Sequence, residues 1–90
     1  MKIIIERGFS KPLFQILSTI SKDKKSASKK FNKDLKDRLK LLLDSPFMCR
    51  ASIYFEDSRY RDLIFKGYTI IYKVEENEIK ILDIFKWQDR

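Results

Sequence analysis

The chain has 90 residues, of which 43% are hydrophobic and only four are Gly or Pro, a composition that excludes intrinsic disorder and predicts one folded domain over 1–90. The absence of histidine and the presence of a single cysteine exclude His-dependent nucleophilic catalysis, an internal disulfide and the usual zinc sites. The charge is uneven: residues 1–50 hold 13 basic and 5 acidic residues (+8), residues 51–90 hold 7 and 8 (−1), and the net +7 indicates an anionic partner.

The first elements are a strand and a helix. Residues 2–6 are short and β-branched, which is typical of a strand. Ser10 then predicts the N-cap of a helix that begins at Lys11, with Pro12 tolerated in its first turn. Apolar side chains spaced i, i+3, i+4, i+7 indicate one buried helix face, which Phe14 widens: Leu13, Ile16, Leu17 and Ile20.

A second amphipathic helix follows a polar turn expected over 21–26, and Asp44-Ser45-Pro46 is predicted to stop it. Its apolar face is formed by Ala27, Phe31, Leu35, Leu39 and Leu42. Its other face is basic and consists of Lys29, Lys30, Lys33, Lys36, Arg38 and Lys40. This basic face either contacts phosphates of a nucleic acid or is simply solvated, and the sequence leaves both readings open. The short connection predicts an antiparallel helical hairpin.

Strands make up the rest of the chain. Residues 47–58 are ambiguous, with either a short strand at 52–55 or an extended loop crossing the sheet edge. Three further strands are expected, separated by polar turns: 60–66, 68–74 and 78–85. The element order is therefore β-α-α-β-β-β, and we predict an α+β fold in which the helical hairpin packs on one face of an antiparallel sheet.

The sequence also limits where the protein can reside and which ligands it can bind. No apolar run approaches the ~18 residues that span a membrane, and the N-terminal residues lack the features of a signal peptide. We therefore expect a cytoplasmic protein with no membrane contact. No metal, cofactor or small-molecule substrate is expected, and without histidine any acid–base chemistry must use other side chains.

The segment 61–74, Arg-Asp-Leu-Ile-Phe-Lys-Gly-Tyr-Thr-Ile-Ile-Tyr-Lys-Val, resembles the centre of the RelE/ParE family of bacterial toxins. The shared pattern is a basic residue, an acidic residue and Leu, followed by Tyr-x-Ile-x-Tyr-x-Val. The strand at 79–85 and the Leu-x-x-Asp-x-Pro end of the hairpin are also similar to the family. The resemblance implies a toxin of a type II toxin–antitoxin pair, silenced by a cognate and often acidic antitoxin. RelE-like members cleave mRNA on the ribosome, whereas ParE-like members inhibit DNA gyrase.

The resemblance also implies which branch is closer. The positions at which RelE-like nucleases carry two lysines and a strand arginine fall here on Tyr60, Asp62 and Thr69. The arginine that follows their last strand falls near Asp89, beside Arg90. Most of the basic constellation is missing, and an aspartate repels phosphate, so the chain resembles the ParE-like branch. If it is a nuclease nonetheless, the weak catalytic candidates are Arg61, Tyr60 and Arg90.

The residues expected to contact a partner protein or nucleic acid are Arg50, Arg59, Arg61, Lys86, Trp87 and Arg90. The alternatives are solvated sheet-edge charges and a tryptophan that closes the core. Tyr68 and Tyr72 are expected in the core, and the thin core is expected to leave an apolar groove for the antitoxin. Three functions remain open: a ParE-like toxin that binds gyrase, an atypical ribosome-dependent mRNA endoribonuclease, and a degenerate, non-toxic binding protein.

Overall fold

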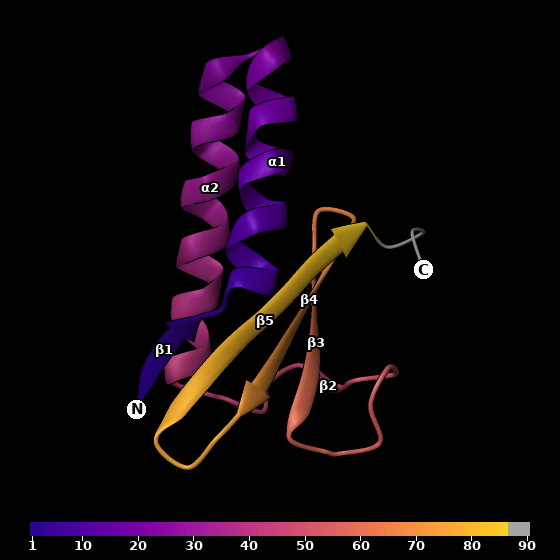
Figure 1. The fold of residues 1–90 in the computed structure, drawn as a ribbon. Coiled ribbons are helices and arrows are strands. Elements are labelled where there is room, and N and C mark those ends of the chain that lie inside the picture. The colour runs from indigo at the N-terminus through magenta and orange to yellow at the C-terminus, as the bar shows by residue number, and fades with distance from the viewer. Residues whose placement is uncertain (87–90) are drawn as a thin grey trace.

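A five-stranded sheet carries a helical hairpin on one face in the computed structural model, which describes residues 1–86 (Figure 1). The elements in chain order are β1 (Lys2–Ile5), α1 (Arg7–Asp23), α2 (Lys25–Lys40), the 3-10 turn η1 (Leu41–Leu43), β2 (Arg50–Ala51), β3 (Tyr60–Phe65), β4 (Tyr68–Val74) and β5 (Glu78–Lys86). This arrangement confirms the predicted α+β class and the meander of β3, β4 and β5.

The strand order across the sheet is β1-β5-β4-β3-β2. All neighbours are antiparallel except β1 and β5, which run parallel with Ile3 opposite Ile79. The expectation of a purely antiparallel sheet is wrong for β1, because no hairpin joins it to its neighbour and fixes its direction. In the ambiguous segment, the short strand expected at 52–55 is wrong: residues 52–59 form a loop at the sheet edge, and the two-residue strand β2 that pairs with β3 lies just before them.

Helix α1 begins earlier than the sequence predicted, at Arg7 instead of Lys11. The carbonyl of Glu6 accepts the first two helical bonds, from Phe9 N (3.0 Å) and Ser10 N (3.0 Å), so no side-chain cap is used. Pro12 consequently lies in the second turn and not the first, where it leaves one helical hydrogen bond unmade.

The predicted turn over 21–26 shrinks to one residue, Lys24, whose extended backbone reverses the chain between the two helices. Its N–H still donates to the carbonyl of Ile20 at 3.0 Å. A second bond ties the helices together beside this junction, since Ser28 Oγ donates to the carbonyl of Leu17 at 2.8 Å. The hairpin is therefore tightly closed at its tip.

The core lies between the hairpin and the sheet, where most of the predicted apolar positions are buried: Phe9, Phe31, Leu35, Leu39, Leu42, Leu63, Phe65, Ile70, Tyr72, Val74, Ile79, Ile81 and Ile84. The tip of the hairpin projects beyond the sheet (Figure 1). Ala27, near the tip, is consequently exposed, against expectation, and the apolar face of α1 is only half-buried. Within residues 1–86, no helix is both long and apolar enough to cross a bilayer.

An irregularity in β5 brings α1 close to the sheet. Ile71 pairs with Asp83 but Tyr72 pairs with Ile81, so Leu82 is an extra residue on β5. Its carbonyl approaches α1 at Gly8, where the Cβ atom of any other residue would lie only 2.5 Å from the Leu82 oxygen. A residue without a side chain is therefore required at this crossing point.

Candidate functional site

The sheet face turned away from the helices holds the three positions that align with nuclease cations. Tyr60, Asp62 and Ile64 share this face of β3, and Thr69 lies on β4 opposite Ile64, diagonal to Asp62. Only 2% of Asp62 and 0% of Thr69 is exposed. The loop after β2 covers them: its Ile53 N–H donates to Asp62 Oδ2 at 3.1 Å, while an Arg50 guanidinium nitrogen lies 3.5 Å from the same oxygen.

Within residues 1–86, the cations on this face lie against acids: Lys73 against Glu75, its register partner Lys80 against Glu78, and Arg50 against Asp62. The three aligned positions carry a phenol, a buried carboxylate and a buried hydroxyl. Lys73, which neighbours Tyr60 across the strands, is already paired with Glu75 at 2.9 Å. Their hydrogen bond raises the pKa of Lys73 and lowers that of Glu75. These side chains hold the loop in place. They are not arranged to stabilise the negative charge of a phosphorane-like transition state.

Tyr60 and Arg61 are two of the weak catalytic candidates from the sequence, and the structure places them on opposite faces of β3. Tyr60 stacks on Phe55 with 4.2 Å between ring centroids. Arg61 instead braces the segment before β2, where it donates to the carbonyl of Cys49 at 3.1 Å and lies 4.7 Å above the ring of Phe47. The two side chains are therefore not brought together.

The other predicted residues are also dispersed. Arg59 forms a fork with Asp57, with its shortest bond at 2.7 Å, and these hydrogen bonds lower the pKa of Asp57 from 3.8 to about 2. Lys86 pairs with Tyr68, at the end of β4 away from Arg59. It lines a mixed hollow of about 410 Å³ between α1 and the sheet. Trp87 and Arg90 lie outside the described residues.

An apolar hollow lies between the two helices. It has a volume of about 260 Å³ and is lined by Ile5, Phe9, Ser10, Leu13, Phe14, Leu17, Asn32, Leu35, Lys36 and Leu39; we call it the α1–α2 groove. Phe14 stands on its rim with 75% of its surface exposed. An aromatic side chain left in water beside an apolar groove is typical of an interface anchor.

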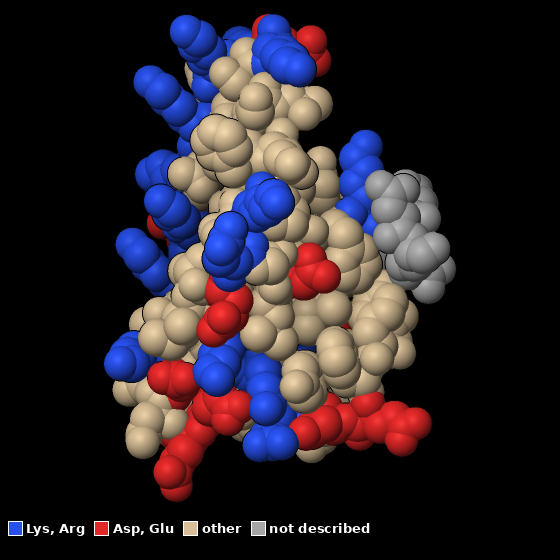
Figure 2. Space-filling model, viewed as in Figure 1, with Lys and Arg blue, Asp and Glu red and all other residues tan. Residues whose placement is uncertain are grey.

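Basic side chains border this groove. Figure 2 shows an uncharged strip along the front of the hairpin with a column of Lys and Arg side chains beside it, over α2. Lys36 belongs to the groove lining itself. An apolar floor with a cationic rim suits a ligand that is apolar on one side and acidic at its edge.

Comparison with known proteins decides the family. The model of the family "ParE toxin of type II toxin-antitoxin system, parDE" matches residues 3–89. This chain belongs to the ParE toxin family. A solved structure described as the chromosomal ParDE TA system from P. aeruginosa has the same fold, with a TM-score of 0.78 at 21% identity, over 96% of this chain and 95% of that one. A search of curated proteins gave no match.

Sequence reasoning about this ParE-family toxin placed its core tyrosines correctly. Tyr72 is fully buried and donates from its hydroxyl to the carbonyl of Pro46 at 2.8 Å, and burial raises its pKa. Tyr68 is half-buried, with its ring 5.7 Å from that of Phe31. Within residues 1–86, no group of three or more His, Cys, Asp or Glu side chains is arranged to hold a metal ion.

The sequence foresaw an apolar groove but not its residues. Its most telling member is Phe14, which the periodicity treated as a widening of the buried stripe. The helical repeat could have predicted the exposure of Phe14. This residue lies about 100° around the helix from Leu13 and therefore outside the face that a partner helix covers. When the apolar face of a helix is wider than its contact with the neighbouring helix, the uncovered part can bind another ligand.

Proposed function

We propose that this ParE-family toxin of a type II toxin–antitoxin system acts by binding a target, DNA gyrase, and not by cleaving RNA. The observation that carries the proposal is the sheet face described above, on which Asp62 and Thr69 are buried under the chain's own loop at positions where family nucleases bear cations. Placing a phosphate against a buried carboxylate is unfavourable. The fold itself fits either branch, so the proposal rests on the chemistry of this face.

We further propose that a cognate antitoxin silences the toxin by placing an apolar segment in the α1–α2 groove. The groove is open, apolar and bordered by Lys36, and it lies against helices whose tip projects from the sheet. The acidic character expected of the antitoxin complements a chain of net charge +7. An amphipathic helix with an acidic edge is the segment that fits this surface best.

The target is tested by inducing the toxin in bacteria without its antitoxin, mapping the 5′ ends of translated mRNAs, and assaying supercoiling by purified gyrase. We expect intact messages, filamenting cells and inhibited supercoiling. New cuts within codons of translated messages would establish the nuclease alternative and refute gyrase binding as the basis of toxicity. Normal growth together with unimpaired supercoiling would identify a non-toxic binding protein instead.

The groove is tested with Phe14→Asp, because this side chain is exposed and the substitution leaves the core intact. We expect the affinity for the antitoxin encoded beside the toxin to fall about 30-fold or more, which is the effect of a hot-spot residue. Ile53→Asp is the matched control, since Ile53 is 58% exposed but lies on the loop after β2. Calorimetry that finds equal affinity losses for both variants excludes the groove as the binding site.

A further inference from the structure

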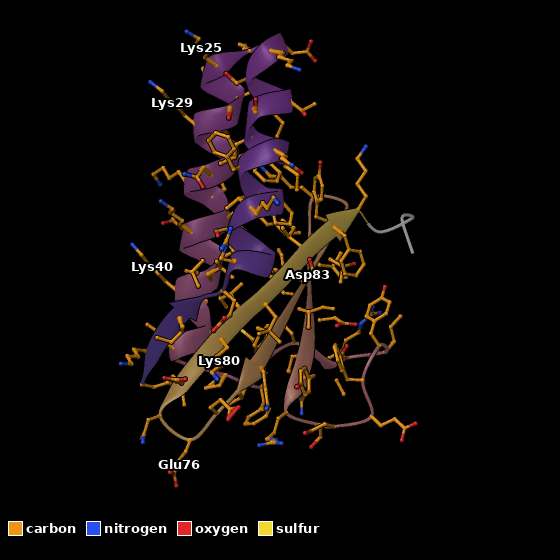
Figure 3. All side chains as sticks on the ribbon, in the orientation of Figure 1. Lys25, Lys29, Lys40, Glu76, Lys80 and Asp83 are labelled. Atoms are coloured by element: carbon orange, nitrogen blue, oxygen red, sulfur yellow. The ribbon has the colours of Figure 1, made fainter. Side chains whose placement is uncertain are left out.

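A straight column of lysines runs along α2, beside the groove. Lys25, Lys29, Lys36 and Lys40 follow one another at intervals of four, seven and four residues, which places them within about 60° around the helix axis. Figure 3 shows Lys25, Lys29 and Lys40 pointing to the same side, away from the sheet. We call these four residues the lysine column; it spans about 22 Å along α2.

The charge of the column is not compensated. Residues 25–40 contain seven basic and two acidic side chains, a net +5. Both acids are engaged by other lysines: Asp34 lies 3.1 Å from Lys30 and 3.3 Å from Lys66, and Asp37 lies 2.9 Å from Lys33. In the part of the chain that the structure describes, no member of the column forms an ion pair.

The side-chain chemistry of the lysine column indicates which class of ligand it binds: a protein, a single-stranded nucleic acid or a duplex. Lysine is depleted at protein–protein interfaces, so the solvated lysines that lie outside the groove lining, Lys25, Lys29 and Lys40, do not favour a protein partner. Single-stranded nucleic acids need aromatic platforms for base stacking, but Phe31, the one aromatic residue of α2, is buried in the core. A rigid row of point charges fits the regular phosphates of a duplex, to which lysines bind by releasing counterions.

We propose that the lysine column binds the phosphate backbone of duplex DNA, without sequence preference. This proposal goes beyond toxicity and antitoxin binding, and it does not depend on either. The groove meets the column only at Lys36, whereas Lys25 and Lys29 lie nearer the hairpin tip than any α2 residue of the groove lining. Lys25 and Lys29 therefore stay accessible while a segment occupies the groove.

The test compares the wild-type chain with the triple variant Lys25→Gln/Lys29→Gln/Lys40→Gln. A control triple, Lys2→Gln/Arg7→Gln/Lys11→Gln, changes the net charge equally at positions of β1 and α1. Glutamine is a good helix former, so both variants are expected to fold, which circular dichroism checks. Fluorescence anisotropy measures binding to a short random-sequence DNA duplex over a range of salt concentrations.

For the wild-type chain, we expect log K to fall with log salt with a slope of about −3 to −4, corresponding to four neutralised phosphates. The column variant should reduce the magnitude of the slope by about 3, and the control variant by less than about 1. Unchanged DNA binding by the column variant, or an equal loss in both variants, overturns the proposal. Tighter binding to the matching single strand, or equal displacement of the duplex by poly-glutamate, overturns it as well.

Discussion

At the scale of single residues, Asp62 shows how a charged side chain is used to build a surface. Its carboxylate is nearly inaccessible, accepts the Ile53 N–H and faces the guanidinium of Arg50, while Oδ1 has no hydrogen-bond partner within residues 1–86. The charge is costly to bury and remains because it holds a loop that has little regular structure of its own. The loop in turn covers the face that a nuclease would need open.

Replacing Asp62 with alanine is expected to lower the free energy of unfolding by about 1–3 kcal/mol, because the Ile53 N–H and the Arg50 guanidinium lose their acceptor. Urea denaturation measures this loss, and hydrogen exchange at Ile53 should accelerate. Asp83→Ala is the control: within residues 1–86 its half-buried carboxyl accepts a hydrogen bond only from the adjacent Ile84 N–H, and burial raises its pKa. Equal stability of the two variants contradicts the structural role of Asp62.

The Asp57–Arg59 fork predicts a dependence on pH with a definite sign. The folded-state pKa of Asp57, about 2, is lower than its ordinary value of 3.8, so the fork stabilises the loop fully above about pH 4 and loses this contribution as the pH falls toward 2. NMR titration of the Asp57 carboxyl should show this low pKa. Arg59→Gln should return the pKa toward 3.8, and a low value that persists in this variant means that another group causes the shift.

At the scale of elements, the crossing of α1 over β5 depends on Gly8. An alanine gains about 1 kcal/mol of helix propensity but forces its Cβ against the Leu82 carbonyl, a backbone atom that yields only if β5 shifts. We expect Gly8→Ala to lower the melting temperature despite the better propensity. Ser10→Ala, at an exposed position of the same helix, is the control. A rise in melting temperature for Gly8→Ala means that the bulge in β5 is free to move.

The elements that sequence reasoning located best are those set by local signals. The strands β3, β4 and β5 follow from period-two alternation and from turns such as Lys66-Gly67, where both residues adopt positive φ (48° and 84°). The start of α1 was missed because a backbone carbonyl, that of Glu6, opens the helix. The direction of β1 was missed because its partner, β5, lies at the other end of the chain.

For the candidate site too, features set by local sequence were predictable and features set by distant partners were not. The presence of a groove followed from the width of apolar stripes, which is a local property. The roles of Arg61 and Asp62 could not be predicted, since these residues contact partners that lie nine to fourteen positions away in the sequence. Arg61 contacts Phe47 and the Cys49 carbonyl, and Asp62 accepts the Ile53 N–H. Residue type predicted their charge correctly, but only the register of β2 on β3 determines what each charge touches.

At the scale of the whole molecule, the charges divide along the fold. Figure 2 shows the basic side chains gathered along the hairpin, while many acidic ones lie at the end of the sheet where Figure 3 labels Glu76. The +8 of residues 1–50 is therefore concentrated over one structural unit. Because the column and the α1–α2 groove share only Lys36, the proposed antitoxin binding and DNA binding are expected to be compatible in one complex.

The parallel pairing of β1 with β5 affects how the protein folds during its synthesis. Residue Ile3 must meet Ile79, so the strand that is synthesised first waits for the one that is synthesised last among the described elements. The hairpin and the meander involve nearby partners and form quickly, whereas closing such a long loop is slow. On the ribosome the sheet therefore stays incomplete for most of translation. An antitoxin that binds the hairpin as proposed would have that interval in which to bind before synthesis of the toxin is complete.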